Sequence, residues 1–125
     1  MSILIVDDNR EVCELMGSLL EMEGWKVRCC TNPMIVFEMI RQRKPKVLIT
    51  DLLMTGLDGR DLLSKLKNDH STADILTILV SAHPDSVNIA ESLGTEAYIS
   101  KPFDVETLVN SVRNLMQKPL QAPKA

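Results

Sequence analysis

Short, mostly apolar runs alternate along the chain with longer segments in which apolar residues recur every three or four positions. The short runs are rich in β-branched residues, and their length predicts strands. These predicted strands are Ile3 to Val6, Trp25 to Cys29, Lys46 to Thr50, Ile75 to Val80 and Ala97 to Ile99. The helical period is clearest between residues 12 and 20 and between residues 105 and 116.

Residues that favour helix ends agree with this division of the chain. Asn32 followed by Pro33 is typical of a helix start, and Asp104 precedes the last periodic segment as a second capping residue. Gly24 and Gly94 stand where two of the predicted helices should end. Strand and helix therefore alternate along the chain.

Such alternation predicts an α/β fold in which parallel strands are joined by right-handed helical crossovers. The expected architecture is a doubly wound five-stranded parallel sheet with helices on both faces. The continuous apolar runs "ILIV", "VLI" and "ILTILV" favour strands that are buried on both sides. Residues 1–117 form one predicted domain, whereas residues 118–125 contain two prolines and no apolar period, which predicts a flexible tail or linker stub.

Composition narrows the class of protein. The chain has 125 residues, of which 45% are hydrophobic and 25% charged, as in an ordinary globular domain. No segment reads as a transmembrane helix or secretory signal, so we expect no membrane insertion and a cytoplasmic location. The net charge of -3 gives no electrostatic reason to expect direct nucleic acid binding. Cys13, Cys29 and Cys30 lack the spacing of a zinc site, and we expect reduced, packed thiols.

Polar residues follow four of the predicted strands. Asp7 and Asp8 come directly after the first strand, and Asp51 after the third. Ser81 follows the fourth strand and Lys101 the fifth. In an open parallel sheet the functional crevice lies beyond the carboxyl ends of the strands, so we expect these groups to share one edge.

This set of residue types predicts chemistry on a phosphoryl group. Crowded carboxylates repel one another unless a cation compensates them, and Mg²⁺ accepts carboxylate oxygens and commonly bridges them to phosphate. Lys101 would add a positive charge and Ser81 a hydroxyl donor for the phosphoryl oxygens. Asp51 is the candidate nucleophile.

At this point the motifs resemble a known family. "VDDN" after the first strand, "DLLMTGLDG" after the third, "SA" after the fourth and "YISKPF" around the fifth are together similar to the receiver domains of two-component response regulators, including the chemotaxis regulators. The resemblance covers about residues 1 to 117. It implies a flavodoxin-like fold with strand order 2-1-3-4-5 and phosphorylation of Asp51 by a sensor histidine kinase or histidine phosphotransferase.

The same resemblance implies a role for each matching residue. Asp8 and Asp51 would hold Mg²⁺ through their side chains, Leu53 through its backbone carbonyl and Asp7 largely through water. Ser81 and Lys101 would contact the phosphoryl group. Tyr98 matches the family's switch aromatic, which moves inward as Ser81 engages the phosphate.

The resemblance also implies what the protein is for. The chain would be a phosphoacceptor switch, catalysing its own phosphorylation and dephosphorylation rather than turning over a substrate. Its output would pass to a downstream protein target or a fused output domain, and homodimerisation on phosphorylation is compatible with it.

Two other functions compete with the switch. A magnesium-dependent phosphatase with an aspartate nucleophile needs a D-x-D pair after one strand, whereas here the acidic pair is adjacent and distant in sequence from Asp51. An interaction domain that has lost the chemistry is the other alternative, although the acidic, hydroxyl and lysine positions are all filled. Tyr98 taken alone also fits a partly buried aromatic with a hydrated hydroxyl.

Overall fold

A computed structural model describes residues 2–54 and 56–117 of the chain. Within them lies a five-stranded sheet in the order β2-β1-β3-β6-β7, with every neighbouring pair parallel. Counted along the chain, this order is the predicted 2-1-3-4-5. The strands are β1 (Ser2–Val6), β2 (Lys26–Cys30), β3 (Val47–Asp51), β6 (Leu76–Ser81) and β7 (Ala97–Ser100).

A short antiparallel pair was not predicted. Strands β4 (Leu53–Met54) and β5 (Leu57–Asp58) form it directly after β3. Strands of two residues are too short to show a period of two in the sequence, which is why the pattern missed them.

The helices follow the predicted alternation with the strands. They are α1 (Arg10–Glu21), α2 (Val36–Gln42), α3 (Gly59–Asn68), α4 (Ser86–Leu93) and α5 (Val105–Met116). The side chain of Asp104 caps α5 by accepting a hydrogen bond from the Thr107 amide at 2.6 Å. Asn32 caps a short 3₁₀ turn, η1 (Pro33–Ile35), which leads into α2. Gly94 ends α4 in the left-handed region, with φ of 71°.

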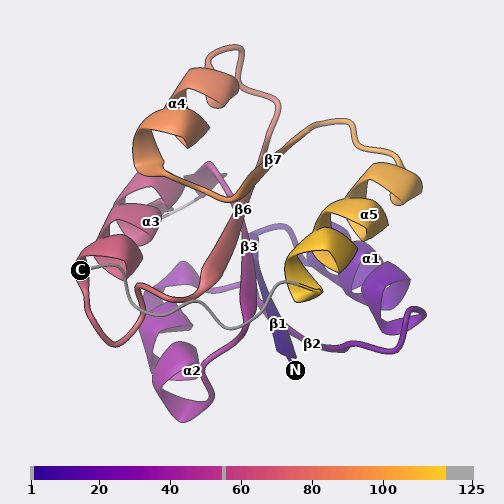
Figure 1. Ribbon diagram of the computed structural model, residues 1–125, viewed down its shortest axis with the longest axis horizontal. Helices are drawn as coiled ribbons and strands as arrows, with labels where there is room; N and C mark the ends of the chain where they lie inside the picture. Colours follow the sequence, from indigo (N-terminus) through magenta and orange to yellow (C-terminus); the bar gives the residue numbers. More distant parts are fainter. Residues whose placement is uncertain (1, 55, 118–125) are drawn as a thin grey trace.

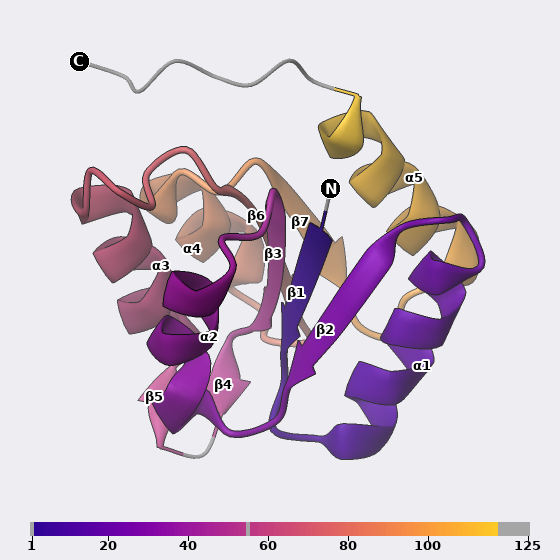
Figure 2. The same ribbon diagram turned by 90° about the horizontal axis from the view of Figure 1, so that it is seen from below.

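The helices cover the two faces of the sheet in separate groups. Helices α1 and α5 pack on one face, and α2, α3 and α4 pack on the other (Figures 1 and 2). Along β1, Ile3 and Ile5 join the core under α1 and α5, whereas Leu4 and Val6 join the core under α2 and α3. Burial on both faces explains why the central strands β1, β3 and β6 are mostly apolar.

The strands run in one direction, so their carboxyl ends share one edge of the sheet. In Figure 2 this edge also carries the start of α1 and the β4–β5 pair. Among residues 2–54 and 56–117, no helix is both long enough and apolar enough to cross a lipid bilayer. The predicted tail at 118–125 lies outside the described residues.

Candidate functional site

Three aspartates meet at the carboxyl edge of the sheet. Asp7 and Asp8 follow β1, Asp51 ends β3, and a carboxylate oxygen from each lies within 4.8 Å of the others. Their burial differs: Asp7 is 1% exposed, Asp51 is partly buried and Asp8 is exposed. The cluster therefore opens to solvent on the side of Asp8.

Backbone amides and one lysine hold the two inner carboxylates. Asp7 accepts a hydrogen bond from the amide of Asn9 at 2.9 Å, and Asp51 accepts one from the amide of Leu52 at 2.8 Å. The Nζ atom of Lys101 lies 3.2 Å from Asp51 Oδ2 and 3.5 Å from Asp7 Oδ2. One positive charge thus bridges two negative charges.

The electrostatics of the cluster favour an added cation. Burial raises the pKa of Asp7 above its ordinary value of 3.8, and the neighbouring charge of Asp51 raises it further. The Asn9 amide and Lys101 lower this pKa but do not restore it. Three carboxylates with oxygen donors only, close together and open on one side, fit a hard divalent ion such as Mg²⁺.

The predicted hydroxyl and switch residues come together through the pairing of β6 with β7. Ser81 is buried at the end of β6, where its Oγ accepts a hydrogen bond from the His83 amide at 3.0 Å. Its carbonyl accepts from the Lys101 amide at 3.0 Å and from the Tyr98 hydroxyl at 3.4 Å. Hydrogen bonds to the Ser81 carbonyl therefore connect Ser81 directly to Lys101 and Tyr98.

Two further observations concern Leu53 and Lys101, both of which the sequence predicted as site residues. Leu53 lies in β4, two positions after Asp51, and the role of its carbonyl stays a prediction. The peptide bond between Lys101 and Pro102 is cis.

Gly59 is a positioning residue that sequence reasoning missed. It begins α3, and a Cβ atom placed there would lie 2.3 Å from the carbonyl oxygen of Asp51. Its amide also donates to the Leu52 carbonyl at 2.7 Å. Only glycine allows α3 to approach the end of β3 this closely. The signal available in the sequence was glycine after Asp58 at the start of a periodic segment.

An apolar groove adjoins Lys101 and was also missed. Its volume is about 510 Å³, and it lies between one side of α1 and the first turn of α5. Leu15 and Val105 line it and are 55% and 51% exposed. The remaining lining residues are Val12, Leu19, Ala82, Lys101, Pro102 and Phe103. Apolar residues at otherwise polar helix positions are the signal that could have revealed it.

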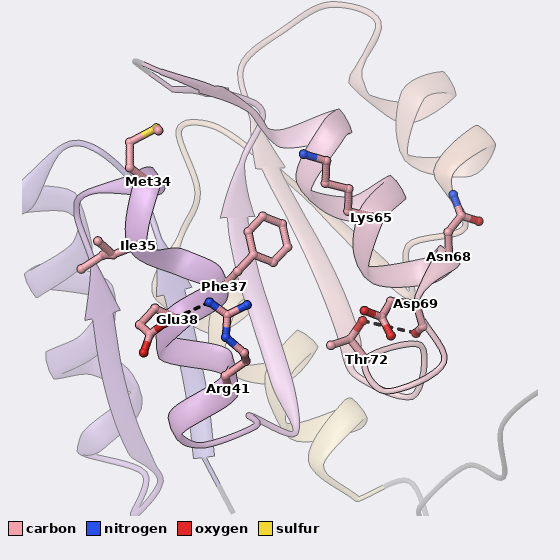
Figure 3. A pocket seen from close by; sticks show the side chains of 9 residues that line it. All are labelled: Met34, Ile35, Phe37, Glu38, Arg41, Lys65, Asn68, Asp69 and Thr72. Carbon is pink, nitrogen blue, oxygen red and sulfur yellow. Dashed lines mark hydrogen bonds and ion pairs between the residues drawn. The ribbon is translucent and has the colours of Figure 1, made fainter.

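A larger cavity lies between α2 and α3, and none of the three aspartates lines it (Figure 3). Its volume is about 860 Å³. The Lys65 amine lies 5.8 Å from the centre of the Phe37 ring across this space, and Arg41 pairs with Glu38. The carboxyl-edge cluster is therefore a separate site.

Comparisons with known proteins agree with this geometry. The family profile described as the response regulator receiver domain matches residues 3–113. The phosphate regulon transcriptional regulatory protein PhoB of Pseudomonas aeruginosa is 32% identical over 119 residues, which are 94% of this chain and 52% of that protein. The response regulator MprA of Mycobacterium leprae is 34% identical over 121 residues, or 94% of this chain and 52% of that protein. The chain thus spans about half the length of these relatives.

Solved structures show the same fold. A putative response regulator from Chloroflexus aurantiacus is 26% identical, with a TM-score of 0.88 over 94% of this chain and 98% of that one. The signal receiver domain of a DNA-binding response regulator from Colwellia psychrerythraea is 28% identical, with a TM-score of 0.87 over 94% and 99%. This chain belongs to the response regulator receiver domain family.

Proposed function

We propose that this protein is the phosphoacceptor switch of a two-component system, working in the cytoplasm. It takes a phosphoryl group from a sensor histidine kinase or histidine phosphotransferase onto Asp51, with Mg²⁺ as cofactor. One observation carries the proposal: the carboxylates of Asp7, Asp8 and Asp51 converge at the sheet edge, with Lys101 bridging two of them. The chain belongs to a family of signalling switches rather than of turnover enzymes, which supports this interpretation of the cluster.

The transfer step follows from these groups. A carboxylate oxygen of Asp51 attacks the phosphorus, an O–P bond forms, and the N–P bond of the donor phosphohistidine breaks as the imidazole leaves. Lys101, already 3.2 Å from Asp51, neutralises charge on the phosphoryl oxygens. Asp8 and Asp51, the carbonyl of Leu53 and, largely through water, Asp7 would hold Mg²⁺, which would offset the remaining negative charge.

The response starts at Ser81. Its hydroxyl turns from the His83 amide to a phosphoryl oxygen, and the loop after β6 follows it. Because the Tyr98 hydroxyl donates to the Ser81 carbonyl, movement of this loop changes the environment of Tyr98. The aspartyl phosphate thereby shifts an existing equilibrium between two conformations.

The donor docks over the apolar groove between α1 and α5. This groove includes Lys101 in its lining, so a protein that fills it also covers the phosphoacceptor edge. Exposed Leu15 and Val105 supply apolar area of the kind that protein interfaces bury. Output passes to a protein target or a fused output domain, with no direct nucleic acid contact by this domain, and a homodimer can form on phosphorylation.

The test is the intact mass of the protein after incubation with Mg²⁺ and acetyl phosphate. The parent gains one phosphoryl group, and the gain is lost without Mg²⁺ and in Asp51→Asn. Asp74→Asn is the matched control, because Asp74 pairs with Lys44 outside the cluster and should leave the gain intact.

Fast hydrolysis would hide the adduct, so beryllofluoride binding is measured in parallel as a stable mimic. Failure of the parent both to gain mass and to bind beryllofluoride would refute the proposal. Undiminished phosphorylation of Asp51→Asn would instead show that another residue is the acceptor.

A further inference from the structure

The three cysteines have different surroundings in the folded protein. All are free thiols. Cys13 in α1 and Cys30 at the end of β2 are buried, whereas Cys29 is exposed. Cys29 is more exposed than the expectation of packed thiols implies, and it lies on β2, an edge strand of the sheet. Cys29 is therefore the most exposed of the three cysteine residues.

The sulfur of Cys29 lies against the first half of α1. The Cys29 thiol donates to the carbonyl oxygen of Cys13 at 3.2 Å, so it lies directly against the residue that carries the buried thiol. Cys13 Sγ contacts the carbonyl oxygen of Ile5 at 3.6 Å, and Ile5 is the register partner of Cys29 across the β1–β2 pair. The sulfur atoms of Cys29 and Cys13 therefore both lie between α1 and the sheet.

The helix surface leaves room for this contact. Gly17 lies one turn after Cys13, and a Cβ atom placed there would be 3.5 Å from Cys29 Sγ. A larger side chain at that position would displace the Cys29 sulfur.

Cys30 is excluded from the pair by the geometry of a strand. Successive side chains of β2 point to opposite faces of the sheet. The Cys30 thiol donates to the Asn32 carbonyl at 3.0 Å and packs in the core under α2 and α3. Cys13 belongs to the core on the other face.

We propose that Cys29 is an oxidation site and that Cys13 is its resolving thiol, with hydrogen peroxide as the oxidant. The Cys29 sulfur attacks the peroxide, an S–O bond forms, and the O–O bond breaks with release of water. The Cys13 sulfur then attacks the Cys29 sulfenic acid, an S–S bond forms, and the S–O bond breaks with release of a second water. Two thiols and one peroxide give one disulfide and two waters.

The order of the steps follows from the burial of the two thiols. Burial raises the pKa of the Cys13 thiol above its ordinary value, and contact with Cys29 raises it further, so Cys13 is a poor first nucleophile. Cys29 is open to the oxidant and therefore reacts first. The resulting bond would fasten α1, which lines the apolar groove, to the edge strand β2. This proposal goes beyond the phosphoacceptor function and does not depend on it.

The experiment treats the folded protein with hydrogen peroxide and records intact mass before and after reduction. The parent and Cys30→Ser should each lose the mass of two hydrogens, as monomers, and recover it on reduction. Cys13→Ser should instead form a sulfenic acid at Cys29 that dimedone traps. Cys29→Ser should show neither product.

Tryptic peptides assign the bond. Cleavage after Arg10, Lys26, Arg28 and Arg41 separates a peptide of residues 11–26, containing Cys13, from one of residues 29–41, containing the other two cysteines. In Cys30→Ser, a linked pair of these peptides can come only from Cys13 and Cys29. In strong urea this selectivity should disappear, because only the fold brings the two sulfurs together.

Three outcomes would overturn the proposal: a bond between Cys29 and Cys30 in the parent, a product found only as a disulfide-linked dimer, or the same selectivity in urea. Lack of any oxidation in the parent under conditions that oxidise a free cysteine peptide would do so as well.

Discussion

Charge at the carboxyl edge of the sheet determines the behaviour of single residues there. Asp7 is buried and shares its surroundings with Asp51, and Lys101 is the cation that lies between them. Burying a carboxylate near another one is costly unless a cation compensates both. Repulsion between these buried carboxylates therefore destabilises the folded protein, and a bound cation would reduce this repulsion.

We predict that Asp7→Asn stabilises the protein when divalent ions are removed. The substitution deletes one buried charge and keeps a similar shape, so the free energy of unfolding in EDTA should rise by on the order of 1 kcal/mol. Urea unfolding in EDTA measures it. With saturating Mg²⁺ the parent should gain stability and the variant should gain much less. Equal gains in the two proteins would show that Asp7 takes no part in binding the ion.

Two contacts between elements have consequences that the elements alone do not show. The start of α3 approaches the end of β3 very closely at Gly59. At the opposite edge of the sheet, Glu96 before β7 joins Lys67 of α3, at 2.7 Å, to the Thr77 amide of β6, at 2.6 Å. The first contact adjoins Asp51, whereas the second is purely structural.

Gly59→Ala should therefore affect stability and phosphorylation together. The added methyl group collides with the backbone of Asp51 and Leu52, which should cost about 1–3 kcal/mol and slow phosphoryl uptake from acetyl phosphate. Gly94→Ala is the matched control: it strains a left-handed residue with open space around it, costs about 1 kcal/mol and should leave uptake unchanged. Normal uptake by Gly59→Ala would mean that this approach does not position Asp51.

The Glu96 contact predicts a pH dependence of stability. Burial alone would raise the pKa of Glu96, but hydrogen bonds from Lys67 and Thr77 outweigh it and bring the pKa below its ordinary 4.5. Because the folded pKa is the lower one, the ionised carboxylate stabilises the protein above about pH 4.5, and this contribution is lost as the pH falls further.

Glu96→Gln should lower the free energy of unfolding at pH 7 by about 1–2 kcal/mol. The difference from the parent should shrink in urea titrations repeated at decreasing pH below 4.5. Exposed Glu91 on α4 offers the control, since Glu91→Gln should leave the free energy of unfolding at pH 7 nearly unchanged. A difference that stays constant with pH would rule out the charge of Glu96 as its cause.

At the scale of the whole molecule, Ser81 connects the aspartate cluster at the carboxyl edge of the sheet to the face near α4. The Ser81 carbonyl accepts hydrogen bonds from the Lys101 amide and the Tyr98 hydroxyl. A displacement of Ser81 is therefore transmitted directly to β7. Packed elements of this kind change between discrete arrangements rather than deform gradually.

Tyr98 is the one tyrosine of the chain, so tyrosine labelled at the ring ε positions gives the resonance of this residue alone in NMR spectra. We predict that Mg²⁺ with beryllofluoride shifts this resonance in the parent and leaves it unchanged in Asp51→Asn. Ser81→Ala should bind beryllofluoride but show a reduced shift. A full shift in Ser81→Ala would place the coupling outside Ser81.

The sequence by itself determined the alternation of strands and helices, the two-sided burial of the sheet and the arrival of polar residues at strand ends. These features are local, because periodicity, capping and turn residues act within a few positions of the chain. The family motifs added the strand order, which the structure confirms.

Only the tertiary structure decided which distant groups touch. Four features each join separate elements of the fold. They are the bridge from Lys101 to Asp7 and Asp51, the close approach of Gly59 to β3, the groove beside α1 and the contact of Cys29 with Cys13. Such contacts depend on strand register and on how helices pack against the sheet. Local pattern does not specify these distances, because they are set by the packing of the entire core.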